Sequence, residues 1–469
     1  MTFQQYIKQK NLDISIISFE EIIGSSRIDS EYFQLKFINL EKNIKSKEFS
    51  RLESITQVNG GKRLPKGETF IDDKNGVPYV RIVDIQSNFI DENSLEYISY
   101  DLHNLLNRYQ IKNRDILVSI VGTLGLIGYN QLNLDKFNFT ENCARLRTKL
   151  INPEYLLAVL ISSIGQLQVD RERVGTNQPK LSLDRLRNFL IPISSSEFQK
   201  AVGDLVLESL KQKELSKKLY LEAEKLLLSE LGLEDYKPTE QNISIKDSQE
   251  VELFGRVDAE FFQPKYDEII EKIKNYKGGY DFLRNLFKQN KESNRLEVEK
   301  INYIEIGDIN ISNGEIIHNE IEKDNLPANA KILLKKDDLL VSTVRPYRGA
   351  IAIVRNEIEN LVGSGAFTVL REKTSYKKET LQILLKLNIY KELMLRYNCG
   401  ASYPVIKDED VLNLPISKID IKVQEKIAEL VKQSHISLDS SKQLLEKAKK
   451  SVEIFIEKDE KEAEEFLNS

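Results

Sequence analysis

The chain has 469 residues, 41% of them hydrophobic and 30% charged, which suits two to four domains with real cores and a hydrophilic surface. No run approaches the roughly 18 apolar residues of a membrane span, the N-terminus is too polar for a secretion signal, and two cysteines cannot make a disulfide framework, so we expect a cytoplasmic protein with no membrane partner. The net charge of −5 lowers the expectation of DNA binding without excluding it, because only the charge on the contacting face matters.

The first distinctive feature along the chain is the phrase RIDSEYFQLKF at residues 27–37, which returns as RVDAEFFQPKY at residues 256–266. Three later pairs keep the same order at offsets between 223 and 229: YVRIVDI with YIEIGDI, KNRDILVSIV with KKDDLLVSTV, and GTNQPKLSLDRLRNFLIPI with GASYPVIKDEDVLNLPI. A period this long indicates a duplicated domain and not a solenoid repeat. The chain therefore consists of two copies of one unit of about 225 residues.

The repeated phrase is predicted to belong to the structural frame, because it precedes the segments in which the two copies differ. Each copy is expected to pack its adjacent aromatic residues and to pair its arginine with the next aspartate: Tyr32 with Phe33 and Arg27 with Asp29, and Phe261 with Phe262 and Arg256 with Asp258. The near-symmetry of the units also places residues 27–37 beside the end of the second long helix.

Each copy has the same internal order of elements. Short apolar runs such as PYVRIVDI, DILVSIVG and AIAIV are rich in β-branched residues and bounded by turn residues, which predicts strands. Segments such as PEYLLAVLISSIGQLQ and KETLQILLKLNIYKEL have helical periodicity. The sequence thus predicts an α+β fold, with two pseudo-symmetric mixed α/β domains separated by a two-helix antiparallel coiled coil.

A long charged helix closes each copy, over about 196–231 in the first and 422–466 in the second. Identical residues recur at steps of four, seven, three and four, the heptad spacing that keeps one stripe facing a partner helix. The predicted seam consists of Leu205, Ser209, Ser216, Leu219 and Ala223 with Leu430, Ser434, Ser441, Leu444 and Ala448. Antiparallel pairing through this seam would hold two domains at a fixed distance, which suits a reader of two separated sites. Packing of each helix on its own domain is the alternative.

Signatures of catalysis are missing from the sequence. The three histidines, His103, His318 and His435, lie far apart in the sequence, and none lies near a cysteine or another histidine at the spacing of zinc ligands. There is no GxxxxGK[ST] loop, and the glycines of GTLGLIGYN (122–130) are more typical of a tight turn than of a dinucleotide site. We predict a binding protein with no catalytic residue and no metal site of its own.

Basic and polar residues gather on the predicted turns, where Arg and Lys can neutralise phosphates and Arg, Asn and Gln can pair with purine edges. The candidate DNA contacts are Lys62, Arg63, Lys66, Arg81, Thr176, Asn177, Gln178 and Lys180 in the first copy, and Arg345, Tyr347, Arg348, Ser402, Tyr403 and Lys407 in the second. Further arginines on these turns are Arg145, Arg147, Arg171, Arg173, Arg371 and Arg396. A solvated surface explains any one of them, but the GGKRLPKG cluster and the equivalent Asn-Gln and Ser-Tyr pairs favour binding.

The order of these phrases, given twice, resembles the specificity (S) subunit of type I restriction–modification systems. The matching phrases are GKRLPKG followed by VPYVRIVDI, DILVSIVGTLG, INPEYLLAVLIS and the tail at 175–192, then IEIGDI, DDLLVSTVRPYRG and the tail at 400–416. The resemblance covers nearly the whole chain. The phrase at 27–37 is not universal to the family, which leaves the type of system open.

The resemblance implies two target-recognition domains, 1–195 and 236–420, and two conserved coiled-coil helices, 196–235 and 421–466. Each domain would read one half of a split, asymmetric site in double-stranded DNA. Two adenine methyltransferase subunits would dock on the chain, and two motor–nuclease restriction subunits would complete a phage-defence complex. S-adenosylmethionine, ATP and Mg²⁺ are expected on these partners, with no cofactor bound by the non-catalytic chain itself.

Three alternatives stay open. The chain could be the specificity chain of a type IIB/IIG-like or other methylation-based defence system. It could be a stand-alone nuclease or methylase, which DNA cleavage or S-adenosylmethionine binding by the pure protein would support. It could also be a coiled-coil tether with two protein-binding domains, which the absence of any effect of DNA on its complex would support.

Overall fold

The computed structural model describes residues 15–25, 27–134, 136–175, 178–241, 243–293, 295–399 and 403–469. The chain divides into two compact units, unit 1 (residues 1–212 with 439–469) and unit 2 (residues 213–438). This division differs from the predicted one, because each unit includes a part of both long helices. The reason is that each helix half packs into the hydrophobic core of its own unit.

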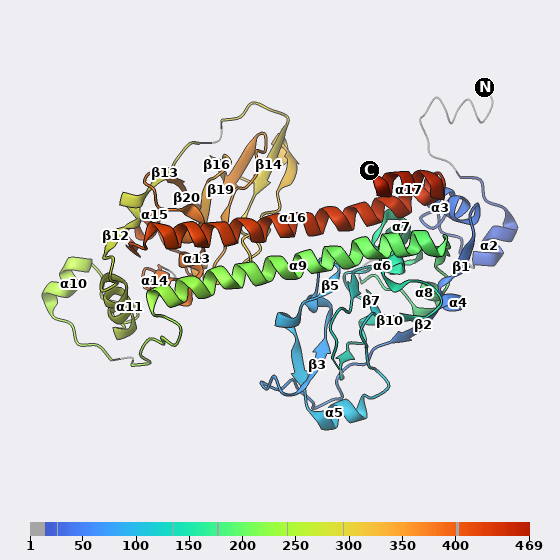
Figure 1. The fold of residues 1–469 in the computed structure, drawn as a ribbon, viewed down its shortest axis with the longest axis horizontal. Helices are drawn as coiled ribbons and strands as arrows, with labels where there is room; N and C mark the ends of the chain where they lie inside the picture. The colour runs from blue at the N-terminus through green and yellow to red at the C-terminus, as the bar shows by residue number, and fades with distance from the viewer. Residues whose placement is uncertain are drawn as a thin grey trace. The chain divides into compact units, whose positions relative to one another are not determined.

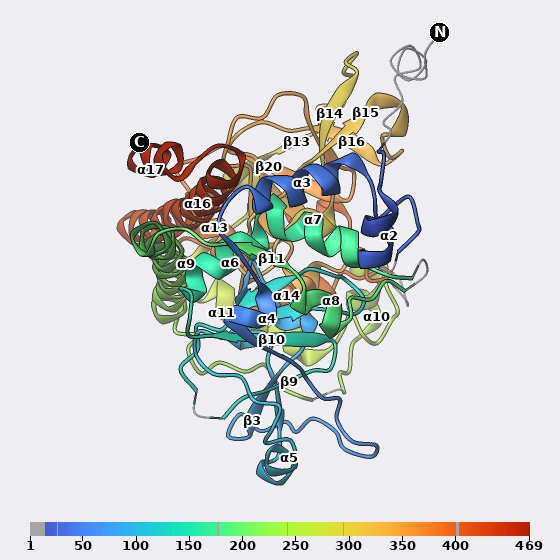
Figure 2. The same ribbon diagram turned by 90° about the vertical axis from the view of Figure 1, so that its right-hand side faces the viewer.

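Unit 1 is built around a six-stranded sheet with the order β2-β10-β7-β8-β5-β4 (Thr56–Gly60, Cys143–Thr148, Ile116–Ser119, Ile127–Tyr129, Phe89–Ile90 and Ile85–Gln86). A three-stranded sheet β6-β3-β9 (Glu96–Ile98, Val77–Val80 and Asn138–Phe139) and the antiparallel pair β1 (Phe49–Arg51) with β11 (Leu190–Pro192) complete its strands. Its helices include α2 (Phe19–Ser25), α3 (Leu35–Lys45), α4 (Leu52–Ile55), α5 (Tyr100–Leu105), α6 (Pro153–Ile161), α7 (Ser163–Glu172) and α8 (Leu183–Arg187) (Figures 1 and 2).

Unit 2 repeats the central part of this arrangement. Its first sheet has the order β13-β20-β17-β18 (Phe287–Asn290, Phe367–Glu372, Leu339–Ser342 and Ile351–Ile353), the counterpart of β2-β10-β7-β8. Its second sheet is β15-β14-β19-β16 (Asn319–Glu322, Lys300–Ile304, Leu361–Ser364 and Ala330–Leu333), and β12 (Tyr280–Phe282) pairs with β21 (Pro415–Ser417). Its helices include α10 (Ser248–Phe254), α11 (Pro264–Lys274), α12 (Leu283–Leu286), α13 (Lys378–Lys386), α14 (Asn388–Leu395) and α15 (Asp408–Leu412). The predicted duplication and α+β fold class are therefore confirmed.

The core of each unit lies between the first sheet and the long helices α9 (Ser196–Leu231) and α16 (Ile421–Glu457). In unit 1, one hydrophobic cluster joins β7, β8 and β10, the buried helix α6, and residues such as Phe198 and Phe455 of the long helices. In unit 2, the equivalent cluster joins β17, β18, α13 and α14 to residues such as Leu227 and Val431. An all-round apolar segment such as PEYLLAVLI forms a helix here because it is covered on every side.

The two long helices run antiparallel, and serine pairs mark their contact. In unit 1, Ser209 Oγ donates to the carbonyl of Ser441 at 2.7 Å, and the Ser195 amide lies 3.2 Å from a carboxylate oxygen of Glu460. In unit 2, Ser434 Oγ donates to the carbonyl of Ser216 at 2.8 Å. The serines and alanines of the predicted seam are buried, and its leucines are half-buried: Leu205, Leu219, Leu430 and Leu444.

The second long helix is shorter than predicted. Helix α16 ends at Glu457, and a separate helix α17 (Glu460–Asn468) begins after Asp459, where the prediction continued one helix to residue 466. The break is stabilised by a helix cap, because the Asp459 carboxylate accepts a hydrogen bond from the Glu462 amide at 2.9 Å. Among the described helices, none is long and apolar enough to cross a membrane.

Candidate nucleic-acid interface

In unit 1, the GKRLPKG loop, which carries candidate residues, and the GTLG turn leave the same edge of the first sheet. The start of β10 pairs with the ends of its two neighbours, Ala144 with Gly60 of β2 and Cys143 with Ser119 of β7. The GKRLPKG loop follows Gly60 and the GTLG turn follows shortly after Ser119. Since neighbouring strands lie about 5 Å apart, the two loops begin about 10 Å from each other.

Glycines set the path of both loops. A Cβ on Gly61 would lie 2.1 Å from the carbonyl oxygen of Thr140, so only glycine fits where the GKRLPKG loop starts. Gly122 and Gly125 have φ values of +80° and +74°, which confirms the turn predicted for the GTLG segment. Lys62 and Lys66 project from the first loop as exposed side chains.

The two ends of a third loop, Val174 and Lys180, lie at the same edge. Val174 and Lys180 exchange two backbone hydrogen bonds of 2.9 and 2.8 Å, Lys180 bridges to Val121, and the Leu181 amide donates to Ile120 at 3.0 Å. Gln178 and Lys180 are exposed, whereas the candidates Thr176 and Asn177 lie outside the described residues. The three loops of the first copy therefore meet at one edge of the sheet.

Unit 2 holds the two ends of its equivalent loop with two of these backbone hydrogen bonds and the same bridge, while the Val405 amide donates to the Asn398 side chain. The Cys399 amide donates to Val405 at 2.9 Å, the Ile406 amide donates to Thr343 at 2.9 Å, and Val344 bridges to Val405. These residues correspond to Val174, Lys180, Leu181, Ile120 and Val121 of the first copy at offsets of 223 to 225. The candidate Ser402 lies outside the described residues.

The structure brings two candidates of the second copy into contact. The Arg345 guanidinium stacks over the Tyr403 ring, 4.3 Å from its centroid, and the Arg345 amide donates to Pro404 at 2.7 Å. Arg345 has a left-handed backbone with φ +48°, and Tyr347 and Arg348 follow it as exposed side chains in a 3-10 turn (Pro346–Arg348). A planar cation stacked on an exposed ring, with a second arginine nearby, can face a polyanion and stack on a base.

Three other candidates are engaged within the protein. Arg63 pairs with Glu141 at 2.5 Å but is 79% exposed. Arg81 binds Asp84, Glu96 and the carbonyl of Ser94 with distances of 2.8 to 3.2 Å, so its guanidinium stabilises the turn that it begins. Lys407 precedes α15, and its amide donates to Asp410 at 2.8 Å, while its side chain is exposed.

The arginines of the adjoining strands are also structural. Arg147 pairs with the buried Asp115 at 2.5 Å, and Arg371 pairs with the buried Asp338 at 2.6 Å, at equivalent places in the two copies. Arg145 donates to the carbonyl of Gln110 and to Asn59. These residues fix the sheet behind the loops.

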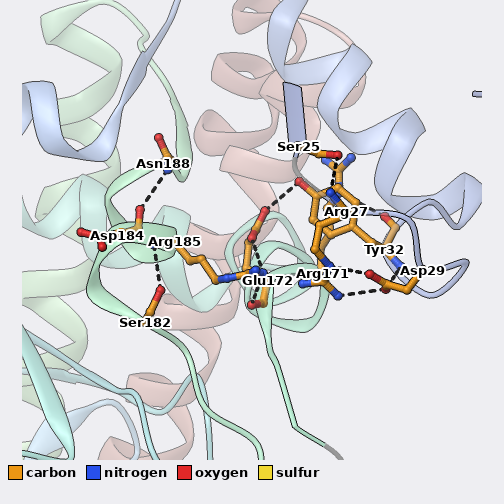
Figure 3. Close-up of polar contacts among 10 residues, drawn as sticks. All are labelled: Ser25, Arg27, Asp29, Tyr32, Arg171, Glu172, Ser182, Asp184, Arg185 and Asn188. Carbon is orange, nitrogen blue, oxygen red and sulfur yellow. Dashed lines mark hydrogen bonds and ion pairs between the residues drawn. The ribbon is translucent and has the colours of Figure 1, made fainter. Parts of the chain in front are cut away.

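The repeated phrase of unit 1 anchors the helix that leads into the third loop. Arg27 donates to Asp29 with distances of 2.5 and 2.9 Å, and Tyr32 packs edge-on against Phe33 with centroids 5.0 Å apart, as predicted. Figure 3 shows that Tyr32 lies between this pair and Arg171 of α7, whose guanidinium is 4.3 Å from the ring centroid. The guanidinium of Arg27 lies 5.0 Å from the same centroid.

The end of α7 continues this network to α8 (Figure 3). Tyr32 Oη donates to the Glu172 carboxylate at 3.0 Å, and Arg185 of α8 donates to the same side chain at 3.2 Å. Burial, together with the Glu172 charge, raises the pKa of Tyr32 to about 12, so the phenol keeps its proton. The hydrogen bond to Asp29 raises the pKa of Arg27, and the same bond lowers the pKa of Asp29, so this pair stays ionised.

The second phrase forms the same sandwich with phenylalanine. Arg256 pairs with Asp258 at 2.7 Å, and Phe261 packs on Phe262 with centroids 5.0 Å apart, again as predicted. The guanidinium groups of Arg256 and Arg396 lie 4.8 and 4.6 Å from the Phe261 centroid.

Sequence reasoning counted Arg171 and Arg396 among the exposed basic turn residues, and this was wrong, because their side chains are 14% and 5% exposed. Arg171 and Arg396 occupy equivalent positions at offset 225, as the aromatic residues Tyr32 and Phe261 do at offset 229. This equivalence was the sequence signal that could have indicated a structural role for the two arginines. The contacts of the phrase are with α3 and α7 in unit 1. The link to the end of α16 comes from Lys47, which donates to the carbonyl of Lys458.

Comparison with known families tests the resemblance. Residues 44–225 match the family described as "Type I restriction modification DNA specificity domain". Over these residues, the first copy is similar to a type I specificity domain. The resemblance to specificity subunits is thereby confirmed, and the match begins in α3, after the repeated phrase at 27–37, and ends in α9.

Two curated relatives agree with this assignment. The EcoBI specificity subunit of Escherichia coli is 31% identical over 130 residues, which is 27% of this chain and 27% of that protein. The HindI specificity subunit of Haemophilus influenzae is 31% identical over 133 residues, 28% of each chain. The matched part thus spans little more than a quarter of the length of these relatives.

Among solved structures, the type I S subunit from M. genitalium aligns with 87% of this chain and 94% of its own, at 15% identity and a TM-score of 0.43. The HsdS subunit from Thermoanaerobacter tengcongensis aligns with 88% and 97%, at 15% identity and a TM-score of 0.29. Within the described part of this chain, no three His, Cys, Asp or Glu side chains gather as a metal site.

Proposed function

We propose that this chain is the DNA-recognition subunit of a restriction–modification complex and that each unit reads one half of a split, asymmetric site in double-stranded DNA. The observation that carries the proposal is the pair of equivalent loops, 174–181 and 399–406, which share two backbone hydrogen bonds at matched positions while their side chains differ between the copies. The specificity-domain match of residues 44–225 supports it for the first copy.

In this proposal, Lys62, Lys66, Gln178 and Lys180 serve the first half-site, with Thr176 and Asn177 in the same loop. Arg345, Tyr347, Arg348 and Tyr403 serve the second half-site, with Ser402 and Lys407 beside them. Phosphate contacts by Lys and Arg position the loops, and the polar and aromatic groups contact bases.

The chain performs no chemistry of its own in this proposal. Two adenine methyltransferase subunits dock on it and supply S-adenosylmethionine, and two motor–nuclease subunits supply ATP and Mg²⁺ chemistry. Because the chain is acidic overall, site-specific binding is expected to require the methyltransferase and to weaken as salt rises.

The test is methylome sequencing of cells with and without this gene, followed by loop variants. Arg348→Ala and Tyr403→Ala should relax only one half of the methylated sequence, by about 1–3 kcal/mol per lost base contact. Arg345→Asn suits the left-handed backbone of that position and should act in the same way. Lys66→Ala in the first copy is the matched control, because its effect should leave the second half-site unchanged. A methylated sequence that is independent of this gene would refute the proposal.

A further inference from the structure

Just before each repeated phrase and at its second residue, the chain exposes large apolar side chains. Patch 1 consists of Ile16, Phe19, Ile23 and Ile28, which are 87%, 75%, 62% and 88% exposed, and patch 2 consists of Ile243, Ile245, Leu253 and Val257, which are 75%, 95%, 79% and 88% exposed. Together with Phe254, these side chains make up nine of the 26 exposed large hydrophobic side chains among the described residues. Such concentration on a surface marks an interaction site.

The patches are equivalent parts of the two copies. Helices α2 and α10 have the same length and lie 229 positions apart, the offset of the repeated phrase itself. At this offset Ile16 corresponds to Ile245, and Ile28 corresponds to Val257. An exposure that occurs twice at matched positions is a property of the repeated unit, so its occupant should bind twice.

The described part of the chain does not bury these helices. Neither α2 nor α10, each seven residues long, has a buried residue. Isolated helices of this length are marginal in water, because a helix this short gains too little from its own hydrogen bonds. In the second copy, the preceding residues 233–241 are described and still leave patch 2 exposed.

Hydrogen bonds and an ion pair nevertheless hold the segment that carries each patch in place. In unit 1, Ser15 Oγ donates to the carbonyl of Phe33 at 2.6 Å, and the Arg27 amide donates to Ser25 Oγ at 3.3 Å (Figure 3). In unit 2, the Asp247 carboxylate caps α10 by accepting a hydrogen bond from the Glu250 amide at 2.8 Å. Lys246 also pairs with Asp267 at 2.9 Å. Both views place α2 beside α3, which follows the phrase (Figures 1 and 2).

The charge around both patches is negative. Residues 15–31 carry four acidic residues and one basic residue, and residues 243–260 carry five acidic and two basic residues. Arg27, Lys246 and Arg256 are all committed to aspartates, whereas Glu20, Glu31 and Glu252 are exposed. This charge repels DNA, and it favours a protein surface with an apolar centre and a rim of Lys and Arg.

We propose that patches 1 and 2 are equivalent docking sites for two copies of one protein, the methyltransferase subunit of the proposed complex, which contacts them through an apolar surface with a basic rim. This inference rests on the proposed function and assigns a surface to its partner. Both patches lie outside the matched specificity domain, which begins at residue 44.

The experiment counts methyltransferase subunits on the full chain by native mass spectrometry after co-expression with the methyltransferase subunit of the proposed complex. The wild-type chain should carry two copies. Ile16→Asp with Ile28→Asp should leave one copy, Ile245→Asp with Val257→Asp should also leave one, and all four changes together should leave none. Because these side chains are at least 87% exposed, the changes remove little folding energy.

The matched control is Leu105→Asp with Leu150→Asp, two side chains that are 68% and 75% exposed outside the patches and should not alter the count. Two copies retained on the fourfold variant would overturn the inference. So would self-association of the wild-type chain that the same changes abolish, because the occupant would then be a second copy of this chain. A wild-type chain that binds no methyltransferase would instead overturn the proposed function.

Discussion

Units 1 and 2 share a frame and differ in what they attach to it. The strand order β2-β10-β7-β8 is repeated as β13-β20-β17-β18, and the same buried ion pair stands behind both loops. The second sheet, in contrast, has three strands in unit 1 and four in unit 2. The two copies thus keep one strand order and one buried ion pair, while their second sheets and loops differ.

The largest expected effect tests the equivalence of the frames. Asp115→Ala and Asp338→Ala each remove a carboxylate, at most 2% exposed, that pairs with a half-buried arginine, although Arg371 also pairs with Glu292 at 3.2 Å. We expect each change to lower the free energy of unfolding of its unit by about 3–5 kcal/mol. Urea titration monitored in both units measures it. Asp184→Ala is the control. The Asp184 side chain, which pairs with Arg187, is 88% exposed, so its removal should change the free energy of unfolding little.

A second test separates the units by pH. Burial, with the nearby Arg355 charge, lowers the pKa of His435 on α16 to about 4, while the first copy has Leu210 at the equivalent position. The unfolded state binds this proton near pH 6.5, so the stability of unit 2 should fall as pH falls from about 6.5 to about 4, by up to roughly 3 kcal/mol.

His435→Leu, which introduces the residue of the first copy, should remove this slope without affecting unit 1. Thermal unfolding followed at a series of pH values between 7 and 4 provides the measurement. A slope of the same size in the His435→Leu variant would show that another group titrates in unit 2.

The smallest effect concerns the ring between two arginines. Tyr32→Leu and Phe261→Leu should each cost about 1–2 kcal/mol, because both cation–π contacts are lost. Tyr32→Phe introduces the residue of the second copy and should cost less, about 1 kcal/mol, since only the hydrogen bond to Glu172 is removed. Hydrogen exchange of the amides at the end of α7 measures the Tyr32 variants, and exchange at the end of α14 measures Phe261→Leu. Protection equal to that of the wild type in all variants would contradict the anchoring role.

The repeats made the frame predictable from the sequence. Residues that match at a constant offset identified the strands, the start of each long helix and the Arg–Asp pairs of the phrase. The packing of individual side chains was harder to predict from the sequence. Arg171 belongs to the same sequence class as an exposed turn arginine, and only packing against Tyr32 reveals its role. The break at Asp459 depends on a local cap, which heptad spacing does not report. The predicted base contacts stay predictions, because side-chain readout depends on docking geometry.

The serine pairs of the long helices have a consequence for how the helices can slide. Their alignment sets Ser209 opposite Ser441 and Ser216 opposite Ser434. A shift by one heptad, about 10 Å along the axis, would match only one serine pair again. In one direction it would set Ser209 against Ala448 and Ser434 against Ala223, which leaves two buried hydroxyls without partners. The two pairs of serine hydroxyls thus favour one register of the two helices over the registers shifted by one heptad.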